Sequence, residues 1–405
     1  MAKWKIRSIL ITFATVCGIL GISGVLIAFG RGYRIDVLNN RVKTTGLISA
    51  TSDPVGAQVY IDTRRETATN NSFAIDPAWY TVEISKEGYI PWEKKLRVQG
   101  EVVTRADAFL FPTSPSLSAL TTTGVHNPVL SPDGTKIAYT TSTSNEKTNQ
   151  ATAKKAGLWV YELAERPLGR NRDPKHVGTS DTVFNFSASQ IYWSPDSTQI
   201  MATIGTSIRL YDVDKLDMYQ NISLTYETYL DEWEQQREVK EHQKLEAFKK
   251  PIIDIASSSA RIISFSPDET KILYEATASA ELARSIDPPL IGTNSTEESR
   301  RIEPGKLYVY DSREDRNYFL LDKTELLPTT PSPVPTQKPT MPLSLFSPPT
   351  TYNPDPLPIH WFPTSRHLLI TLEGKIDVVE YDRTNWITVY SGPFQDGFIA
   401  PWPNG

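Results

Sequence analysis

The sequence predicts an all-β protein in which a small β-sandwich and a β-propeller follow one N-terminal helix. Three observations support this prediction: an uncharged run at the N-terminus, short alternating strands at hairpin spacing, and a proline-turn motif that recurs from residue 131 onward. The expected domains are a basic flank and transmembrane anchor, a linker, the sandwich and the propeller, in residues 1–33, 34–45, 46–112 and 113–405.

The composition excludes several classes of function. The net charge of −5 and the pI of about 5.7 come without a compensating basic stripe, so we expect no nucleic-acid partner. Cys17 is the only cysteine, which excludes an intrachain disulfide and a zinc site built from two thiolates. We therefore expect no metal and no other cofactor.

The N-terminus predicts where the protein resides. Lys3, Lys5 and Arg7 precede a run of 23 uncharged residues from Ser8 to Gly30. As a helix rising about 1.5 Å per residue, this run is long enough for a hydrocarbon core of roughly 30 Å. It is longer than the apolar core of a cleaved signal peptide, and residues 28–30 make a poor cleavage site. We expect a single-pass anchor with the N-terminus in the cytoplasm and the bulk of the chain extracytoplasmic.

Short alternating strands follow the linker. Residues 47–52 form the first expected strand, and the Asp53-Pro-Val-Gly56 stretch has the residues of a tight turn. Val59 and Ile61 then alternate with polar residues, and a second hairpin is expected around residues 86–88. Strands of this length and spacing predict a small sandwich of about 65 residues.

The same stretch resembles the PEGA family. Residues 54–57 read Pro-Val-Gly-Ala, followed by "QVYID" and then "YTVEISKEGYIPWEKKLRV", and the resemblance covers about residues 46–112. Two positions depart from the family pattern: Thr63 replaces a usual glycine, and Trp79 stands where a glycine is usual. The resemblance implies a surface and envelope β module without catalytic residues.

The recurring motif predicts the propeller. "SPDGTKIAY" at 131 returns as "SPDSTQIMA" at 194, "SPDETKILY" at 266 and "FPTSRHLLI" at 362. Proline presets the turn, aspartate bonds its own backbone, and glycine supplies a positive φ. Each copy is followed by a strand that ends in Tyr and an acid, at Glu162, Asp212, Asp311 and Asp382. Four antiparallel strands per copy make a propeller blade, which must pack on neighbouring blades.

Uneven spacing of the motif indicates insertions. A charged stretch without glycine predicts a helix within residues 222–252 on the rim of the propeller, residues 279–304 form a loop, and residues 328–358 are proline-rich. The final "WPNG" starts another copy, so we expect about five blades with the last one truncated, or a ring closed by an N-terminal strand.

Residues 115–405 resemble TolB-type and WD-type propellers. The whole arrangement is similar to membrane-anchored bacterial envelope proteins.

The sequence offers no reaction centre. It contains no Gly-x-Ser-x-Gly elbow, P-loop or His-Glu-x-x-His, and we expect none of its five histidines to have a ligand partner at i, i+4. The recurring acids are interpreted as turn caps, and Trp193 and Trp361 as core anchors. For a binding surface we expect exposed aromatic residues, namely the helix face with Trp233, and the loop with Trp386 and Tyr390.

These features favour a non-enzymatic, membrane-anchored extracytoplasmic scaffold whose propeller face docks a protein or a cell-envelope polymer. The alternative is a propeller hydrolase, or the regulatory propeller of a peptidase that lacks its catalytic domain. A sensor ectodomain is a third hypothesis, but only about seven residues precede the apolar run. The sequence does not predict the oligomeric state.

Overall fold

The computed structural model describes residues 2–30, 33–36, 41–115, 119, 121, 124–142, 156–163, 173–326, 357–393 and 398–402. The chain divides into two compact units. The first comprises residues 1–115, 284–299 and 313–316, and the second comprises residues 116–283, 300–312 and 317–405. The predicted proline-rich insertion lies largely outside the described residues, as does the end of the final "WPNG" copy.

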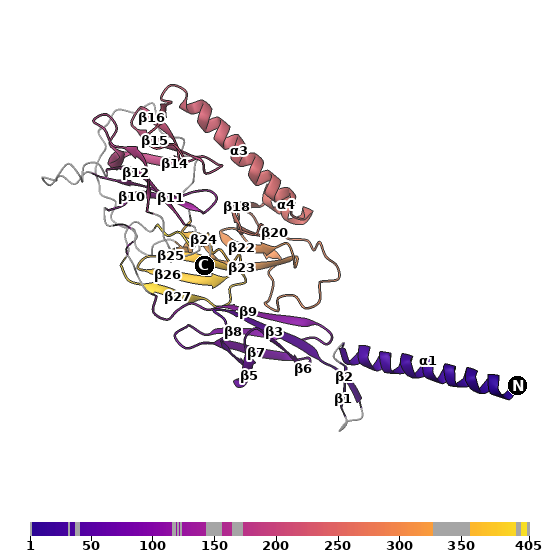
Figure 1. The fold of residues 1–405 in the computed structure, drawn as a ribbon. Coiled ribbons are helices and arrows are strands. Elements are labelled where there is room, and N and C mark those ends of the chain that lie inside the picture. Colours follow the sequence, from indigo (N-terminus) through magenta and orange to yellow (C-terminus); the bar gives the residue numbers. More distant parts are fainter. Residues whose placement is uncertain are drawn as a thin grey trace. The chain divides into compact units, whose positions relative to one another are not determined.

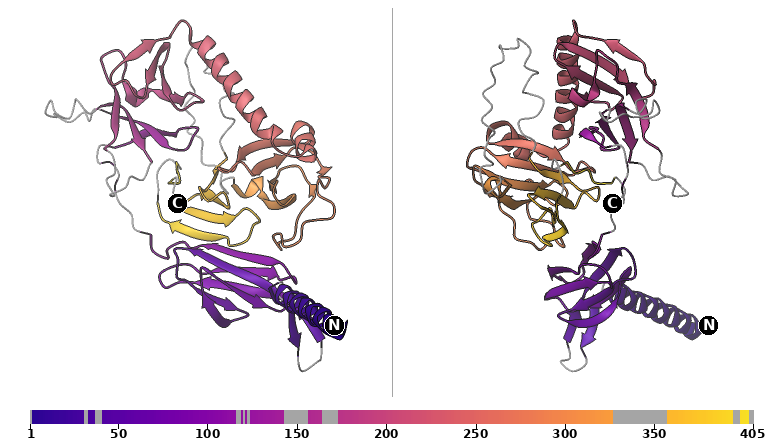
Figure 2. Two further views of the ribbon diagram at one scale, coloured as in Figure 1. Left: turned by 45° about the vertical axis from the view of Figure 1, so that its right-hand side comes forward. Right: turned by 90° about the vertical axis from the view of Figure 1, so that its left-hand side faces the viewer.

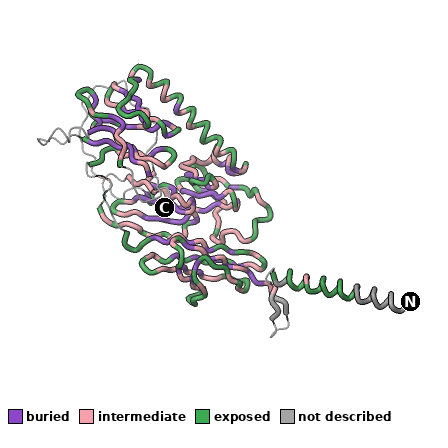
Figure 3. The backbone as a smooth tube through the Cα atoms, viewed as in Figure 1, coloured by how far each residue is buried: buried purple, intermediate pink, exposed green. Residues whose placement is uncertain are grey.

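The first unit begins with helix α1, Ala2–Gly30. Its described large apolar side chains, between Phe13 and Ile27, are exposed (Figure 3). Among the described residues, no helix combines the length and the apolar character that crossing a membrane requires. Residues 34–45, which were expected to be a linker, contain most of a hairpin made by β1 (Tyr33–Asp36) and β2 (Arg41–Thr44).

Two sheets follow the hairpin (Figure 1). One contains β6 (Asn71–Ile75), β3 (Gly46–Asp53) and β9 (Val103–Phe109), in that order. The other contains β5 (Arg64–Ala68), β4 (Gln58–Ile61), β7 (Trp79–Ser85) and β8 (Trp92–Arg97). The sequence did not predict β5 and β6, nor that β9 would return parallel to β3.

The core of the first unit follows from strand alternation. The side chains at alternate positions of β4, β7 and β8 point inward, including Val59, Ile84 and Trp92, and they meet Ile48 from the other sheet. Thr63, at the position of the family's glycine, has a φ of 74° in the turn between β4 and β5. The two departures from the family pattern therefore lie outside this core.

The second unit contains four four-stranded antiparallel sheets among its described residues, which we call blades one to four (Figure 2). Blade one contains β10 (His126–Leu130), β11 (Lys136–Thr141), β12 (Gly157–Glu162) and β13 (Lys175–Thr179). Blade two contains β14 (Gln190–Trp193), β15 (Gln199–Ile204), β16 (Ser207–Asp212) and β17 (Tyr219–Asn221), after the 3-10 turn η1 (Phe186–Ala188).

Blade three contains β18 (Ala260–Phe265), β19 (Lys271–Ala276), β22 (Lys306–Asp311) and β23 (Arg316–Asp322), followed by η2 (Lys323–Leu326). Blade four contains β24 (Ile359–Trp361), β25 (His367–Leu372), β26 (Lys375–Glu380) and β27 (Ile387–Ser391). Within blade three, β20 (Ala280–Glu281) and β21 (Arg301–Ile302) pair at the base of the predicted loop insertion.

The blades pack in pairs. Ile200 and Trp193 of blade two share a buried cluster with Leu158 of blade one, and the indole Nε1 of Trp193 donates to the carbonyl of Val129 at 3.1 Å. Blades three and four share a second cluster that includes Trp361. Trp193 and Trp361 are buried, as their interpretation as core anchors requires.

Helices occupy the faces of blades two and three that these two pairs leave open. Helix α3 (Tyr226–Glu246) packs on blade two, while α4 (Lys250–Ser258) packs on blade three together with Phe248. The Nζ of Lys240 donates to the carbonyl of Pro195 in the blade-two turn, and Lys244 pairs with Glu269 in the blade-three turn. The predicted helix is confirmed, but it covers blade faces instead of following the rim.

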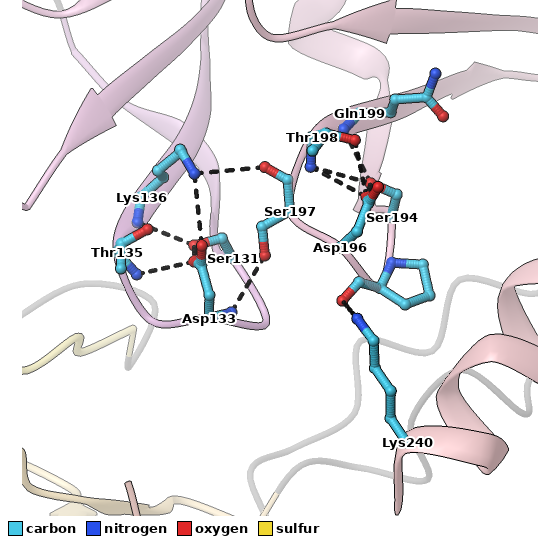
Figure 4. A network of polar contacts seen from close by, with 11 residues as sticks. Ser131, Asp133, Thr135, Lys136, Ser194, Asp196, Ser197, Thr198, Gln199 and Lys240 are labelled. Atoms are coloured by element: carbon cyan, nitrogen blue, oxygen red, sulfur yellow. Dashed lines mark hydrogen bonds and ion pairs between the residues drawn. The ribbon is translucent and has the colours of Figure 1, made fainter.

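The turn motifs repeat one hydrogen-bond network. In blade one, the hydroxyl of Ser131 donates to Asp133, whose Oδ1 also accepts from the backbone N–H of Thr135 at 3.0 Å. Gly134 has a φ of 70°, and its counterpart Ser197 in blade two has a φ of 62°. The Ser197 hydroxyl accepts from the N–H of Asp133 at 3.2 Å, which joins two successive turns (Figure 4).

These networks predict that the protein loses folding stability at acidic pH. Burial raises the pKa of Asp133, Asp196 and Asp268, but hydrogen bonds from the serine two residues earlier and from neighbouring groups outweigh burial and lower the pKa overall. A carboxyl group whose pKa is lower in the folded state stabilises the protein above its unfolded pKa of about 3.9, and that stabilisation is lost as the pH falls further.

Replacing all three aspartates with asparagine is therefore expected to flatten the loss of unfolding free energy below about pH 4, because an amide accepts similar hydrogen bonds without titrating. Urea unfolding of both proteins at pH 7 and pH 3 measures this difference. Equal losses on acidification in the two proteins would show that the turns do not contribute.

Candidate functional site

The structure corrects one predicted binding residue. Trp233 is only 3% exposed and is the buried residue of α3. It packs against Met201, Ile208 and Leu210 of blade two. The apolar face of the helix is therefore a core contact, because an amphipathic helix buries its apolar stripe against the nearest apolar sheet face.

Trp386 and Tyr390 lie on β27 or beside it, and both are at least partly exposed. The indole Nε1 of Trp386 donates to Asp377 Oδ2 at 3.0 Å, whereas the Tyr390 hydroxyl donates to the carbonyl of Pro393. Trp386 lies on the face of the sheet to which Asp377 points, because the two side chains are hydrogen-bonded. Tyr390 is paired with Ile376, the neighbour of Asp377, as the result of a register shift in β27. Adjacent strand residues point to opposite faces, so Trp386 and Tyr390 do not share one surface. Their binding role stays a prediction.

The recurring acids have different surroundings. Asp212 accepts from the N–H of Asp214, and Asp382 accepts from the N–H of Thr384, so both cap the turns that follow them. Asp311 is buried, and its Oδ2 lies 3.7 Å from the Nζ of Lys271. They do not share one set of contacts.

Metal-ligating residues are dispersed. Throughout the part of the chain that the structure describes, no group of three or more His, Cys, Asp or Glu side chains is arranged to hold a metal ion. His367 is buried and its Nδ1 lies 2.8 Å from the hydroxyl of Thr364. His242 is exposed and pairs with Glu246, so the expectation that no histidine has a partner at i+4 was wrong for this residue, because both side chains lie on one face of α3.

The strongest candidate for a binding surface lies at the outer edge of blade two. β17 is the last strand of its sheet, and each of its three residues is exposed. Four apolar side chains near it are also exposed, by 49–74%: Val183, Leu216, Met218 and Tyr219. We call these four residues the edge patch.

A buried arginine organises the edge patch. The guanidinium of Arg209 lies 4.5 Å from the ring centre of Phe184 and 4.1 Å from that of Tyr219. Its Nη1 donates to Asp181 Oδ2 at 2.8 Å. The other oxygen of Asp181 accepts from the N–H groups of Val183 and Phe184. One carboxylate therefore holds both the arginine and the loop that presents Val183.

The electrostatics agree with this arrangement. The hydrogen bond from Arg209 is the main cause that lowers the pKa of Asp181, with further help from the backbone N–H groups of Phe184 and Val183. The carboxylate is therefore ionised at neutral pH. Stacked arginine and aromatic side chains lose little further freedom when a partner binds, so this framework is preorganised.

Sequence reasoning missed the edge patch because it searched for aromatic residues on insertions. The available signal was the stretch "DVDKLDMYQN", in which Leu216 and Met218 stand among charged residues of a connecting turn. Apolar residues in a short polar turn have no core to enter, which makes them candidates for contact with another molecule.

Comparison with known proteins identifies one part of the chain. The family model described as "PEGA domain" matches residues 45–113, which are the two sheets of the first unit. These residues are a PEGA domain. The predicted boundaries of 46–112 differ from the match by one residue at each end. No curated protein matches the chain.

Two solved structures illustrate distant similarity to the chain. A protein assigned as TolB from Agrobacterium tumefaciens is 10% identical, with a TM-score of 0.21 and coverage of 89% of this chain and 96% of that one. Dipeptidyl peptidase 4 from Porphyromonas gingivalis is also 10% identical, with a TM-score of 0.15 and coverage of 85% and 41%. At such TM-scores neither similarity bears on the activity of this protein.

Proposed function

We propose that this protein is a non-enzymatic, membrane-anchored extracytoplasmic binding protein whose edge patch receives an extended segment of a protein partner. The observation that supports the proposal best is the patch itself: exposed apolar side chains beside the outer edge of β17, the last strand of its sheet, held by the buried Arg209 and its ion pair with Asp181. Exposed apolar surface of this kind is typical of protein-binding sites.

The strand edge favours an extended peptide. The outer edge of β17 has no strand partner within its sheet, so some of its backbone N–H and C=O groups point away from β16. A peptide that adds to such an edge gains main-chain hydrogen bonds, while its alternate side chains contact the neighbouring surface. A cell-envelope polymer is the alternative occupant. It is disfavoured because one face of the Tyr219 ring, on which a sugar could stack, is already covered by Arg209.

The anchor and the location complete the proposal. The uncharged run from Ser8 to Gly30 and the exposed apolar side chains of α1 support insertion into a membrane. The basic residues before the run support a cytoplasmic N-terminus and an extracytoplasmic PEGA domain and blades.

Substituting Met218 with glutamate is expected to weaken partner binding by about tenfold or more, because a buried unpaired charge is costly at an interface. Val239→Glu is the matched control: it introduces the same charge at an exposed apolar position on α3, away from the patch. Photo-crosslinking in cells, with benzoylphenylalanine in place of Gln220, measures how much partner occupies the edge patch. It is done in the otherwise unsubstituted chain, in Met218→Glu and in Val239→Glu.

A protein adduct that Met218→Glu removes and Val239→Glu keeps is the expected result. An adduct that contains glycan would assign the patch to an envelope polymer instead. Equal adducts in all three backgrounds, or none in any, would contradict the proposed site.

A further inference from the structure

The first unit contains a second exposed apolar element besides α1. Residues 284–299 belong to this unit although they lie between β20 and β21 in sequence. Leu290 and Ile291 at the tip of this segment are 45% and 70% exposed, and Val103 at the start of β9 is 50% exposed. We call these three residues the apolar tip.

The segment that presents the apolar tip is firmly held. The N–H of Gly292 donates to the side chain of Gln99, and the N–H of Arg97 donates to the hydroxyl of Ser295 at 2.9 Å. A Cβ on Gly292 would come within 2.4 Å of a methyl carbon of Val102, and its φ is 76°, so glycine is needed for this approach. The exposure of Leu290 and Ile291 is therefore not the result of a loosely attached loop.

The apolar tip and the end of α1 meet at one turn of the PEGA domain. Residues 98–102 connect β8 to β9. Tyr33, which follows α1 closely, donates its hydroxyl to Glu101 of this turn. Gly292 is bonded to Gln99 of the same turn. Figure 1 likewise shows the segment between β20 and β21 over the end of β9 that lies nearest to α1.

We propose that the apolar tip is a second membrane contact, which inserts into the headgroup region of the same bilayer that α1 enters. The inference rests on the anchoring part of the proposed function. Two exposed apolar elements tied to one five-residue turn are placed to meet one lipid surface. Transfer of Leu and Ile side chains out of water is favourable. The stretch 288–292, which contains Leu290 and Ile291, carries no charge that would oppose insertion.

The contact would orient the PEGA domain on the membrane. A single helix leaves the domain free to tilt, whereas a helix and a loop tip at one end of the sandwich hold that end towards the bilayer. β3 and β9 both start at this end, with Leu47 paired to Val103. The turn that contains Val55 follows β3 and therefore lies at the opposite end, away from lipid.

Fluorescence in lipid measures the contact directly. The full chain with Cys17→Ser and Ile291→Cys is labelled with the environment-sensitive dye NBD and reconstituted into phosphatidylcholine nanodiscs. A doxyl quencher is placed near the headgroups for position 291 and for its control, and near the bilayer midplane for the label at Cys17, which lies close to the centre of the proposed span. The matched control is Cys17→Ser with Val55→Cys, an exposed apolar residue of the same unit. Unsubstituted chain labelled at Cys17 reports on α1. We expect the dye at position 291 to shift to shorter wavelength and to be quenched, and the dye at position 55 to do neither.

Each outcome separates the tip from the anchor. If the dye at position 291 behaves like the one at 55 while the Cys17 label is quenched, the tip contact is refuted and the anchor stands. If neither position 291 nor Cys17 is quenched, both proposals fail. If position 291 is quenched and Cys17 is not, the tip meets lipid without α1, which refutes the proposed span and with it the inference that the tip accompanies α1 into one bilayer.

Discussion

Replacing Trp233 with alanine is expected to lower the unfolding free energy of the second unit by about 3–5 kcal/mol. Trp233 is the buried residue of α3 and fills the space between that helix and Met201 and Leu210 of blade two. The alanine variant loses the transfer free energy of the indole and leaves a cavity, because β15 and β16 are held in their sheet and collapse only in part. Urea unfolding followed by far-ultraviolet circular dichroism measures the loss.

Val239→Ala is the matched control on the same helix. Val239 is exposed, so its truncation is expected to change the unfolding free energy by less than about 0.5 kcal/mol. Similar small effects of the two substitutions would mean that α3 does not pack on blade two. A loss confined to Trp233→Ala would support the helix as a covering element of that blade.

The second large effect is expected at Lys271. Its replacement by alanine should lower the unfolding free energy of the second unit by about 3–5 kcal/mol. Its Nζ lies 3.7 Å from Asp311 Oδ2 and 5.0 Å from the ring centre of Tyr381. Both members of the ion pair are buried, so the alanine variant leaves the buried carboxylate of Asp311 without the ammonium group of Lys271.

The double variant Lys271→Met/Asp311→Leu is the control for this pair. It removes both charges and fills the space with apolar side chains, so we expect it to recover most of the lost stability. Thermal and urea unfolding of the two variants beside the wild type give the comparison. A single variant as stable as the wild type would show that solvent already screens the pair.

The local structure was largely predictable from the sequence. The turn at Ser131–Gly134 needs only proline geometry, an aspartate acceptor and a residue that tolerates positive φ, all of which act within a few residues. The strand after each turn contains a run of three apolar residues, and it is buried at consecutive positions. Trp193 and Trp361 were correctly interpreted as core residues. The PEGA domain was predicted from the resemblance of residues 46–112 to that family, and the family model matches residues 45–113.

The candidate site was much less predictable. Trp233 was expected on a surface and is buried, because the sequence gives the apolar stripe of a helix but not the blade face that covers it. Arg209, Phe184 and Tyr219 are far apart in sequence and look unremarkable one by one. They form one stacked group only because β16, β17 and the loop after β13 meet at one edge of blade two.

By itself the sequence determined the recurring turns and most of the strands, since these depend on backbone preferences and on neighbouring residues. It did not determine β5 and β6, nor the parallel pairing of β9 with β3. Only the tertiary structure decided which faces are covered: α3 and α4 on blades two and three, and residues 284–299 on the turn between β8 and β9. The reason is that burial depends on contacts between distant segments, and a segment's own pattern shows that it needs a partner without showing which one.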